Sequence, residues 1–401
     1  MDFDGISNYC DEIYETLFNL IETPGPSLAC ARILGEGRAP EKEFPMTRSI
    51  KEITGGFEES CNIRLWEDHG NIVLVGGLDS DNPDDEEVKR IPIVLGAHMD
   101  EVTYLVTNKS DNGTHVILPL CSPPTRLFHH KEARVLGMRD GELVTVGSGK
   151  FDAEEIIRIG RDKSVRMEGL KYLLKVEEDM GVKPGDVAIQ DYVSVRKYVG
   201  PDSVIEAKAL DDRVGTTAVL YALRFLSQRM PIKVILSGDE EGVPSDVSWA
   251  RLILPTYERY CRRDVVTLLC DGVNGADIKE CPDYEGKFLS DALLLPYTAN
   301  GKGGGDYRLF SILRENVLPT AKENGFAARV LTDYASRSYD PKIMNEFPMI
   351  AFIDWSNGLV GNSLFRCHYH EEILLRQVLN IVGCLYWTCV HLSENRNNVT
   401  L

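Results

Sequence analysis

The chain has 401 residues, of which 43% are hydrophobic and 26% are charged, so it is long enough for a large core and a second domain. Its net charge of −18 at pH 7 argues against nucleic-acid binding, because phosphate recognition needs a surface rich in lysine and arginine. No apolar run approaches the roughly 20 residues of a membrane-spanning helix, which argues against a membrane protein.

The N-terminus and the cysteines both point to the cytoplasm. The first five residues include two aspartates, and the N-terminus lacks the basic and apolar regions of a signal peptide. The 10 cysteines are scattered and form no C-x-x-C pair, so a zinc ribbon or a thioredoxin-like motif is not supported. We therefore expect a reduced, cytoplasmic protein.

The first elements alternate between helix and strand. Residues 7–22 carry apolar side chains at helical spacing, and the run Thr23-Pro-Gly-Pro-Ser27 ends that helix. A strand begins at Asn71, and the acidic stretch 79–87 is expected to form a solvated surface loop.

Residues 107–201 differ in character from the segments on either side. They hold short β-rich runs broken by Gly, Pro and Asn, which is typical of a small barrel or sandwich. From residue 209 onward, helical and strand patterns alternate, as in a sheet flanked by helices. Because 107–201 contains no group of metal-binding residues and interrupts two α/β halves, we interpret it as an inserted domain.

Four short apolar runs each end on side chains that can bind a metal ion. They lead into His98 and Asp100, into Asp239-Glu240-Glu241, into Asp271 and into Asp354. In open α/β sheets, ligands bind outside the carboxyl ends of the strands. With the Asp211-Asp212 pair and the late His368, these residues predict a site for two divalent ions.

Each residue has a role that its chemistry suggests. His98 would be a ligand, and Asp100, two residues on, would accept its second ring N–H and orient it. Asp211 would bridge the two ions, which lie about 3.5–4 Å apart in such sites. Since Asp211 and Asp212 precede a helical run that starts near Thr216, either could instead be an ordinary helix cap.

The remaining acids divide between ligand and base. Adjacent carboxylates repel each other, so their clustering at a strand end suits a cation site. We predict Glu241 as a ligand and Glu240 as the general base that takes a proton from water. Asp271 is the best candidate for the last acidic ligand, with Asp354 as its rival. Either His368 or His370 could complete the second ion site, and their spacing does not choose between them.

Four motifs resemble one known family, the tetrahedral (TET) metallo-aminopeptidases, which include the glutamyl and deblocking aminopeptidases and some proteins once labelled endoglucanases. The motifs are Gly96-Ala-His-Met-Asp-Glu-Val102, Ala207-Lys-Ala-Leu-Asp-Asp-Arg-Val-Gly215, the Glu240-Glu241 pair and Asp68-His-Gly-Asn71. The resemblance covers nearly the whole chain.

The resemblance implies a fold and a set of site residues. The fold would be a central mixed α/β sheet flanked by helices, formed by residues 1–106 and 202–401, with 107–201 as an inserted small β-barrel used in assembly. The metal ligands would be His98, Asp211, Glu241, Asp271 and His368. Asp100 would orient His98, and Glu240 would be the base. The family has a Glu four residues after its last His ligand, as Glu372 follows His368, which favours His368 over His370. If Gly242 anchors the alignment, the acidic pair becomes Asp239 and Glu240.

The same resemblance implies the activity. Two divalent ions, zinc in preference to cobalt or manganese, would activate a bridging hydroxide that attacks the first peptide bond of substrates with a free N-terminus. Family members form dodecamers, so a homo-oligomer is expected. The alternatives are a related two-metal N-deacylase or carboxypeptidase, and a catalytically silent homologue that acts as a binding or assembly protein.

Overall fold

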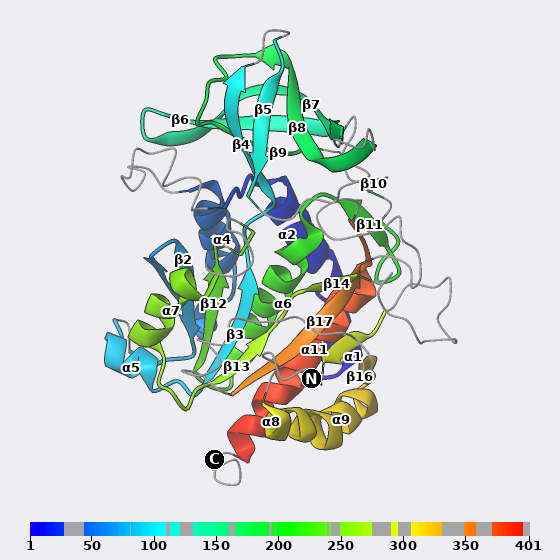
Figure 1. Cartoon of the computed structure of the whole chain (residues 1–401). Coiled ribbons are helices and arrows are strands. Elements are labelled where there is room, and N and C mark those ends of the chain that lie inside the picture. Colours follow the sequence, from blue (N-terminus) through cyan, green and yellow to red (C-terminus); the bar gives the residue numbers. More distant parts are fainter. Residues whose placement is uncertain are drawn as a thin grey trace.

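A computed structural model describes most of the chain. The described residues are 1–27, 44–80, 82–109, 113–120, 131–159, 165–191, 195–196, 198–238, 240–241, 249–274, 290–295, 306–330, 349–357 and 371–395. Two bodies are visible, a layered α/β part and a barrel that stands at one edge of it (Figure 1). In the described part of the chain, no helix is long and apolar enough to cross a membrane.

The α/β part is built on a nine-stranded mixed sheet, in the order β1-β2-β12-β3-β13-β17-β15-β16, with β14 beside β17. Its middle strands β12, β3, β13 and β17 are mutually parallel, so their carboxyl ends meet at one edge. The nine strands are β1 (Arg64–Asp68), β2 (Asn71–Gly76), β3 (Ile93–His98), β12 (Ile232–Ser237), β13 (Val266–Leu269), β14 (Gly272–Asn274), β15 (Ala292–Leu295), β16 (Ala328–Val330) and β17 (Ile350–Asn357).

Helices cover both faces of this sheet (Figure 1). Alternate side chains of each strand enter different cores, since successive side chains point to opposite faces. In β2, Ile72 and Leu74 pack with the helices α2, α6 and α11, whereas Val73 and Val75 pack on the side of α5 and α7. The helices are α1 (Phe3–Ser7), α2 (Cys10–Glu22), α4 (Pro45–Gly55), η1 (Glu59–Cys61), α5 (Asp85–Lys89), α6 (Leu210–Ser227), α7 (Trp249–Tyr260), α8 (Tyr307–Ile312), the π-helical turn η4 (Leu313–Val317), α9 (Leu318–Glu323) and α11 (Leu375–Glu394).

The second body is a closed barrel with the strand order β4-β5-β8-β7-β6-β9. Its interior holds Tyr104, Val135, Phe151, Leu174 and Ala188, all of them buried. The strands are β4 (Thr103–Lys109), β5 (His115–Pro119), β6 (Glu132–Arg139), β7 (Glu142–Ile159), β8 (Val165–Asp179) and β9 (Val187–Gln190). The predicted mixed sheet with an inserted barrel is confirmed. The domain limits at 106/107 and 201/202 stay a prediction, and the first barrel strand begins at Thr103.

A small three-stranded sheet pairs the segment that follows the barrel with the segment that precedes the C-terminal helix. It consists of β10 (Val195–Arg196), β11 (Val204–Ala207) and β18 (Glu371–Leu374) in the order β10-β11-β18. Since β11 leads into α6 and β18 leads into α11, this sheet fixes the starts of the two helices that pack beneath the main sheet.

One local expectation is corrected by the structure. The end of the acidic stretch 79–87, expected to be a loop, forms the start of helix α5. Asp84 caps this helix: its side chain accepts from the N–H of Glu87, and the Glu87 side chain accepts from the N–H of Asp84. This reciprocal pair satisfies two backbone donors, which is why acidic residues here form a helix rather than a loop.

Candidate metal centre

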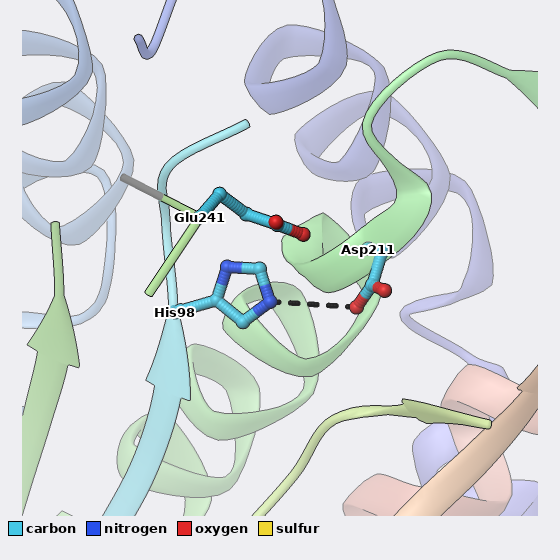
Figure 2. A group of neighbouring side chains, drawn as sticks. All are labelled: His98, Asp211 and Glu241. Carbon is cyan, nitrogen blue, oxygen red and sulfur yellow. Dashed lines mark ion pairs between the residues drawn. The ribbon is translucent and has the colours of Figure 1, made fainter. Parts of the chain in front are cut away.

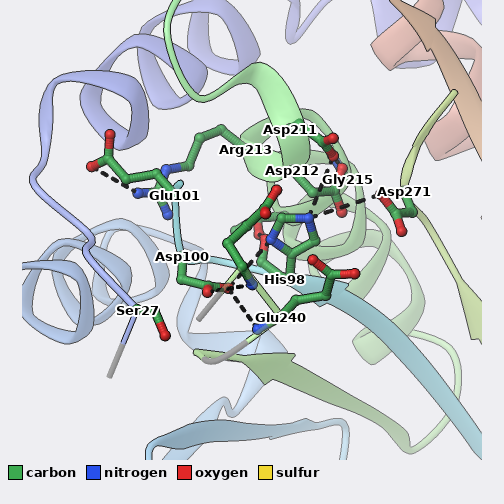
Figure 3. A network of polar contacts seen from close by, with 12 residues as sticks. Ser27, His98, Asp100, Glu101, Asp211, Asp212, Arg213, Gly215, Glu240 and Asp271 are labelled. Carbon is green, nitrogen blue, oxygen red and sulfur yellow. Dashed lines mark hydrogen bonds and ion pairs between the residues drawn. The ribbon is translucent and has the colours of Figure 1, made fainter. Parts of the chain in front are cut away.

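The candidate site lies where the parallel strands end, and His98 stands at its middle. His98 is the last residue of β3, and its Nε2 atom lies 3.4 Å from Asp211 Oδ1 and 3.8 Å from Asp271 Oδ1. Its other ring nitrogen, Nδ1, lies 3.4 Å from Asp100 Oδ1. The imidazole is thus enclosed by three carboxylates from different segments (Figure 3).

Two groups of side chains could each hold a metal ion, and they share one member. His98, Asp211 and Glu241 form the first group, and Asp211, Asp212 and Asp271 form the second; in each, the ligand atoms lie within 4.8 Å of one another. Figure 2 shows the first group converging from β3, from the start of α6 and from the segment after β12. The shared residue, Asp211, is the one predicted to bridge two ions.

Asp100 connects the two halves of the site. Its Oδ1 accepts from the backbone N–H of Glu240 at 3.1 Å, and its Oδ2 accepts from that of Glu241 at 2.8 Å. The same carboxylate faces His98, so it holds the imidazole and the acidic pair in one arrangement. Thr216 in α6 donates to the carbonyl of His98 at 2.8 Å, which fixes the end of β3 against this helix.

The start of α6 explains how two adjacent aspartates differ in role. The Asp211–Asp212 peptide bond is cis, and both residues lie outside helical backbone geometry. The Oδ1 atom of Asp212 accepts from Gly215 N–H and from the Trp355 indole N–H, each at 2.9 Å. Asp212 therefore caps the regular part of α6, which begins after the two non-helical residues, and it also belongs to the second group of potential ligands. The Asp211 carboxylate is directed toward His98, while its backbone N–H donates to Glu371 Oε2 at 3.1 Å.

The site concentrates negative charge in a buried place. His98, Asp211, Glu241 and Asp271 are between 1% and 6% exposed. Burial by itself would lower the pKa of His98, but its contacts with Asp100 and Asp211 hold that pKa well above the usual range. Burial, with the charge of Glu241, raises the pKa of the Glu240 carboxyl to about 7. Such perturbed groups gather at functional sites, and a bound cation would relieve their repulsion.

A buried ion cluster supports the site from one side. Glu101 accepts from Lys208 Nζ at 3.1 Å and from Gly25 N–H at 2.9 Å, and its carboxylate lies 3.8 Å from the Arg213 guanidinium. Arg213 is fully buried. Glu101, Lys208 and Arg213 lie within the motifs that supply Asp100 and Asp211, and Figure 3 shows Glu101 and Arg213 beside the site. Through the hydrogen bond from Gly25 N–H, the cluster also ties the N-terminal segment to the site.

The structure brings together most, but not all, of the residues predicted from the sequence. His98, Asp100, Asp211, Glu240, Glu241 and Asp271 meet at one edge of the sheet. The rival Asp354 is buried in β17 and is in neither candidate metal group of the described residues. His368, His370 and Asp239 lie outside the described residues. Their assigned roles, like those of the other site residues, stay predictions.

Sequence reasoning missed three contributors to this site. It assigned a ligand role to Asp211 but not to its neighbour Asp212, which the structure places in the second group of potential ligands. It gave no role to Glu371, although an acid beside Glu372 after the histidines was a weak signal. The Glu101–Arg213 pair was contained in the two quoted motifs, but the motifs do not show that the two side chains meet.

Residues 83–242 of the chain match a family model described as M42 glutamyl aminopeptidase. The resemblance predicted from the sequence is therefore confirmed. This match contains His98, Asp100, Asp211 and the Glu240-Glu241 pair. It ends before Asp271 and His368.

Solved structures with the same fold align over nearly the whole chain. An aminopeptidase from the archaeon Desulfurococcus kamchatkensis is 17% identical, with 95% of each chain covered and a TM-score of 0.68. A TET aminopeptidase from a marine-sediment member of the Thaumarchaeota is 16% identical, with 94% of this chain and 95% of that chain covered and a TM-score of 0.65. The TET1 peptidase of Pyrococcus horikoshii, described as able to assemble into a tetrahedron or a large octahedral shell, is 16% identical, with 94% and 98% covered and a TM-score of 0.60.

Proposed function

We propose that this protein is a metal-dependent aminopeptidase that releases N-terminal residues from peptides, using two divalent ions. The observation that carries the proposal is the shared position of Asp211 in two groups of potential metal ligands. A carboxylate placed between two ligand groups can bind one ion with each oxygen, which is what two-metal hydrolysis requires. The family match of residues 83–242 and the aminopeptidases of the same fold support it.

The residues present suit a divalent transition metal. We propose His98, Asp211, Glu241 and Asp271 as ligands, with His368 as the fifth. A mixed imidazole and carboxylate set suits zinc, and also cobalt or manganese. When bound, such ions lower the pKa of water and polarise the scissile carbonyl.

The remaining steps belong to side chains of this chain. Asp100 keeps His98 in one orientation, because its carboxylate faces Nδ1 and is itself anchored by two backbone N–H groups. We propose Glu240 as the base that takes a proton from the attacking water and passes it to the leaving amine. Its backbone is anchored to Asp100 next to the ligand Glu241, so its carboxylate stands beside the site without being needed in either ligand group.

We also propose a division of labour between the two bodies of the molecule. Residues 1–106 and 202–401 would form the catalytic part, and residues 107–201 the inserted part used in assembly. The barrel carries none of the candidate ligands among the described residues. Proteins of the same fold are described as a dodecamer and as a tetrahedron or a large octahedral shell. These descriptions support a homo-oligomer, and we propose a dodecamer. The described cysteines are free, which fits the predicted cytoplasmic location.

The test is hydrolysis of a panel of aminoacyl-p-nitroanilides, each paired with its N-acetylated counterpart. Activity should be confined to substrates with a free amine, be lost on chelation and return with zinc or cobalt. An Asp271→Asn variant should lose activity and one metal ion, whereas Asp264→Asn, at an exposed turn, should lose neither.

The same panel separates the alternatives. Hydrolysis of the acetylated substrates would identify an N-deacylase, and release of C-terminal residues from peptides would identify a carboxypeptidase. A protein that binds metal but cleaves nothing would be a silent homologue. Activity that survives complete removal of metal would contradict the metal-dependent mechanism itself.

A further inference from the structure

A cavity of about 690 Å³ lies at the end of the sheet opposite the candidate metal centre. It is lined by the residues that begin the same four parallel strands: Ile93 and Val266 start β3 and β13, while Pro231 and Met349 directly precede β12 and β17. In Figure 1 this is the edge away from the barrel, near α5 and the end of α11. The metal centre stands at the opposite ends of those strands, so the two sites are separate.

The walls of the cavity are mainly apolar. Ile91, Val265 and Leu392 line it together with the strand starts, and each of these side chains is otherwise almost fully buried. The volume lies within the roughly 300–1,000 Å³ that small-molecule pockets occupy, and such pockets combine apolar walls with a few polar groups that orient the ligand. The cavity therefore has the size and lining of a site for a small molecule with an apolar body.

The charged groups at the rim of the cavity differ in whether they have an ion-pair partner, and this difference indicates the charge of the ligand. Lys89 pairs with Glu86 at 3.3 Å, and Arg262 pairs with Asp264 at 3.7 Å. The Glu87 carboxylate, which also lines the cavity, accepts from Asp84 N–H at 3.0 Å. The guanidinium of Arg90, which also lines the cavity, makes no hydrogen bond or ion pair with any described residue. An arginine presents two parallel N–H donors that match a carboxylate.

We propose that this cavity is a second ligand site, which binds a small monocarboxylate with an aliphatic or aromatic body. The apolar body would lie against the strand starts, and the carboxylate would pair with Arg90 at the rim. Among the described residues that line the cavity, Arg90 is the one cation without an ion pair, which suits a single negative charge, and the net charge of −18 disfavours a polyanion. The site uses none of the metal-centre residues, so the proposal does not depend on the peptidase activity.

The experiment is equilibrium dialysis of the full-length protein against radiolabelled octanoate, with octan-1-ol and octylammonium as uncharged and cationic comparisons. Octanoate should bind more tightly than either of these, and equally well before and after chelation of metal. Arg90→Gln should weaken octanoate binding about tenfold, the loss expected for one charge-assisted contact, and should leave octan-1-ol binding unchanged. Ser393→Phe, which fills the cavity from the exposed end of α11, should weaken both ligands.

Matched controls make the result decisive. Arg314→Gln removes another exposed arginine, in η4 and away from the cavity, and should leave octanoate binding unchanged. The proposal is wrong if octylammonium binds as well as octanoate, if Arg90→Gln has no more effect than Arg314→Gln, or if chelation abolishes binding. It is also wrong if no ligand binds at millimolar concentration, and in that case dissociation of an oligomer by Ser393→Phe would identify the face as a contact between copies of the chain.

Discussion

The carboxylate of Asp100 offers the sharpest test of how the candidate site is organised. Three groups meet on it: the backbone N–H of Glu240 and the imidazole of His98 on Oδ1, and the backbone N–H of Glu241 on Oδ2. In Asp100→Asn, one oxygen becomes an amide NH₂, which cannot accept a hydrogen bond. At least one of these donors then faces another donor in a buried place.

The size of the expected effect follows from the number of donors that lose their acceptor. One buried donor left without an acceptor costs about 1–3 kcal/mol. Replacing the partner of a metal-binding histidine typically costs 10–100-fold in metal affinity, which is about 1.4–2.7 kcal/mol and agrees with the loss of one such bond. We therefore expect Asp100→Asn to bind zinc about 10–100-fold more weakly and to be less stable by about 1–3 kcal/mol.

The assay is competition for zinc against a chromophoric chelator, with urea unfolding of the same samples. Asp186→Asn is the matched control, because Asp186 is equally buried and accepts from Arg139 at 2.9 Å and from Lys183 N–H at 2.9 Å, but lies in the barrel. It should lose stability and keep its zinc affinity. Wild-type zinc affinity in Asp100→Asn, or an equal loss in both variants, would refute the reasoning.

Three further predictions concern the base, the acid stability and the start of α6. Glu240→Gln should lower kcat about 10²–10⁴-fold with both metal ions retained; unchanged kcat would show that another group is the base. The Arg224 guanidinium lowers the pKa of Glu58 from 4.5 to about 2, so this pair stabilises the fold above pH 4.5 and loses its effect as the pH falls toward 2. Glu58→Gln should flatten that part of a plot of unfolding free energy against pH, and Glu59→Gln should not. Gly215→Ala would place a methyl group in a clash with the Asp212 carboxylate, and calorimetry should show a loss of about 1–3 kcal/mol in unfolding free energy. Gly55→Ala in α4, where an added methyl group would meet no atom outside the adjacent helical backbone within 4 Å, should instead be neutral or stabilise by up to about 1 kcal/mol.

The sequence was informative where local pattern and sheet geometry act together. His98 and Asp271 each follow an apolar run, and parallel strands bring their carboxyl ends to one edge whatever their order in the sheet. Their proximity could therefore be predicted without knowing that β3 and β13 are neighbours. The barrel was predictable for a similar reason, since short β-rich runs between turn residues have few other ways to bury their apolar faces.

Other features depend on tertiary packing that no local pattern contains. The contact between Asp211 N–H and Glu371 joins residues 160 positions apart, and the link from Glu101 to Lys208 spans 107 positions. The acidic stretch at Asp84–Glu87 was misread because its high charge favours a solvated loop, while its capping pattern favours a helix. In the structure, the hydrogen bonds between the Asp84 and Glu87 side chains and the backbone outweigh the preference of the charged side chains for a solvated loop.

The position of β3 in the sheet has a consequence for synthesis on the ribosome. Its two neighbours, β12 and β13, begin at Ile232 and Val266, so β3 has no partner on either side until well over a hundred further residues exist. At translation rates of roughly 5–20 residues per second, that delay is on the order of ten seconds. All six barrel strands lie between Thr103 and Gln190, so the barrel can close during this interval. We expect the inserted body to fold first. Until β12 and β13 have been made, the apolar strand that ends in His98 stays unpaired in the nascent chain, where it can pair with other chains and aggregate.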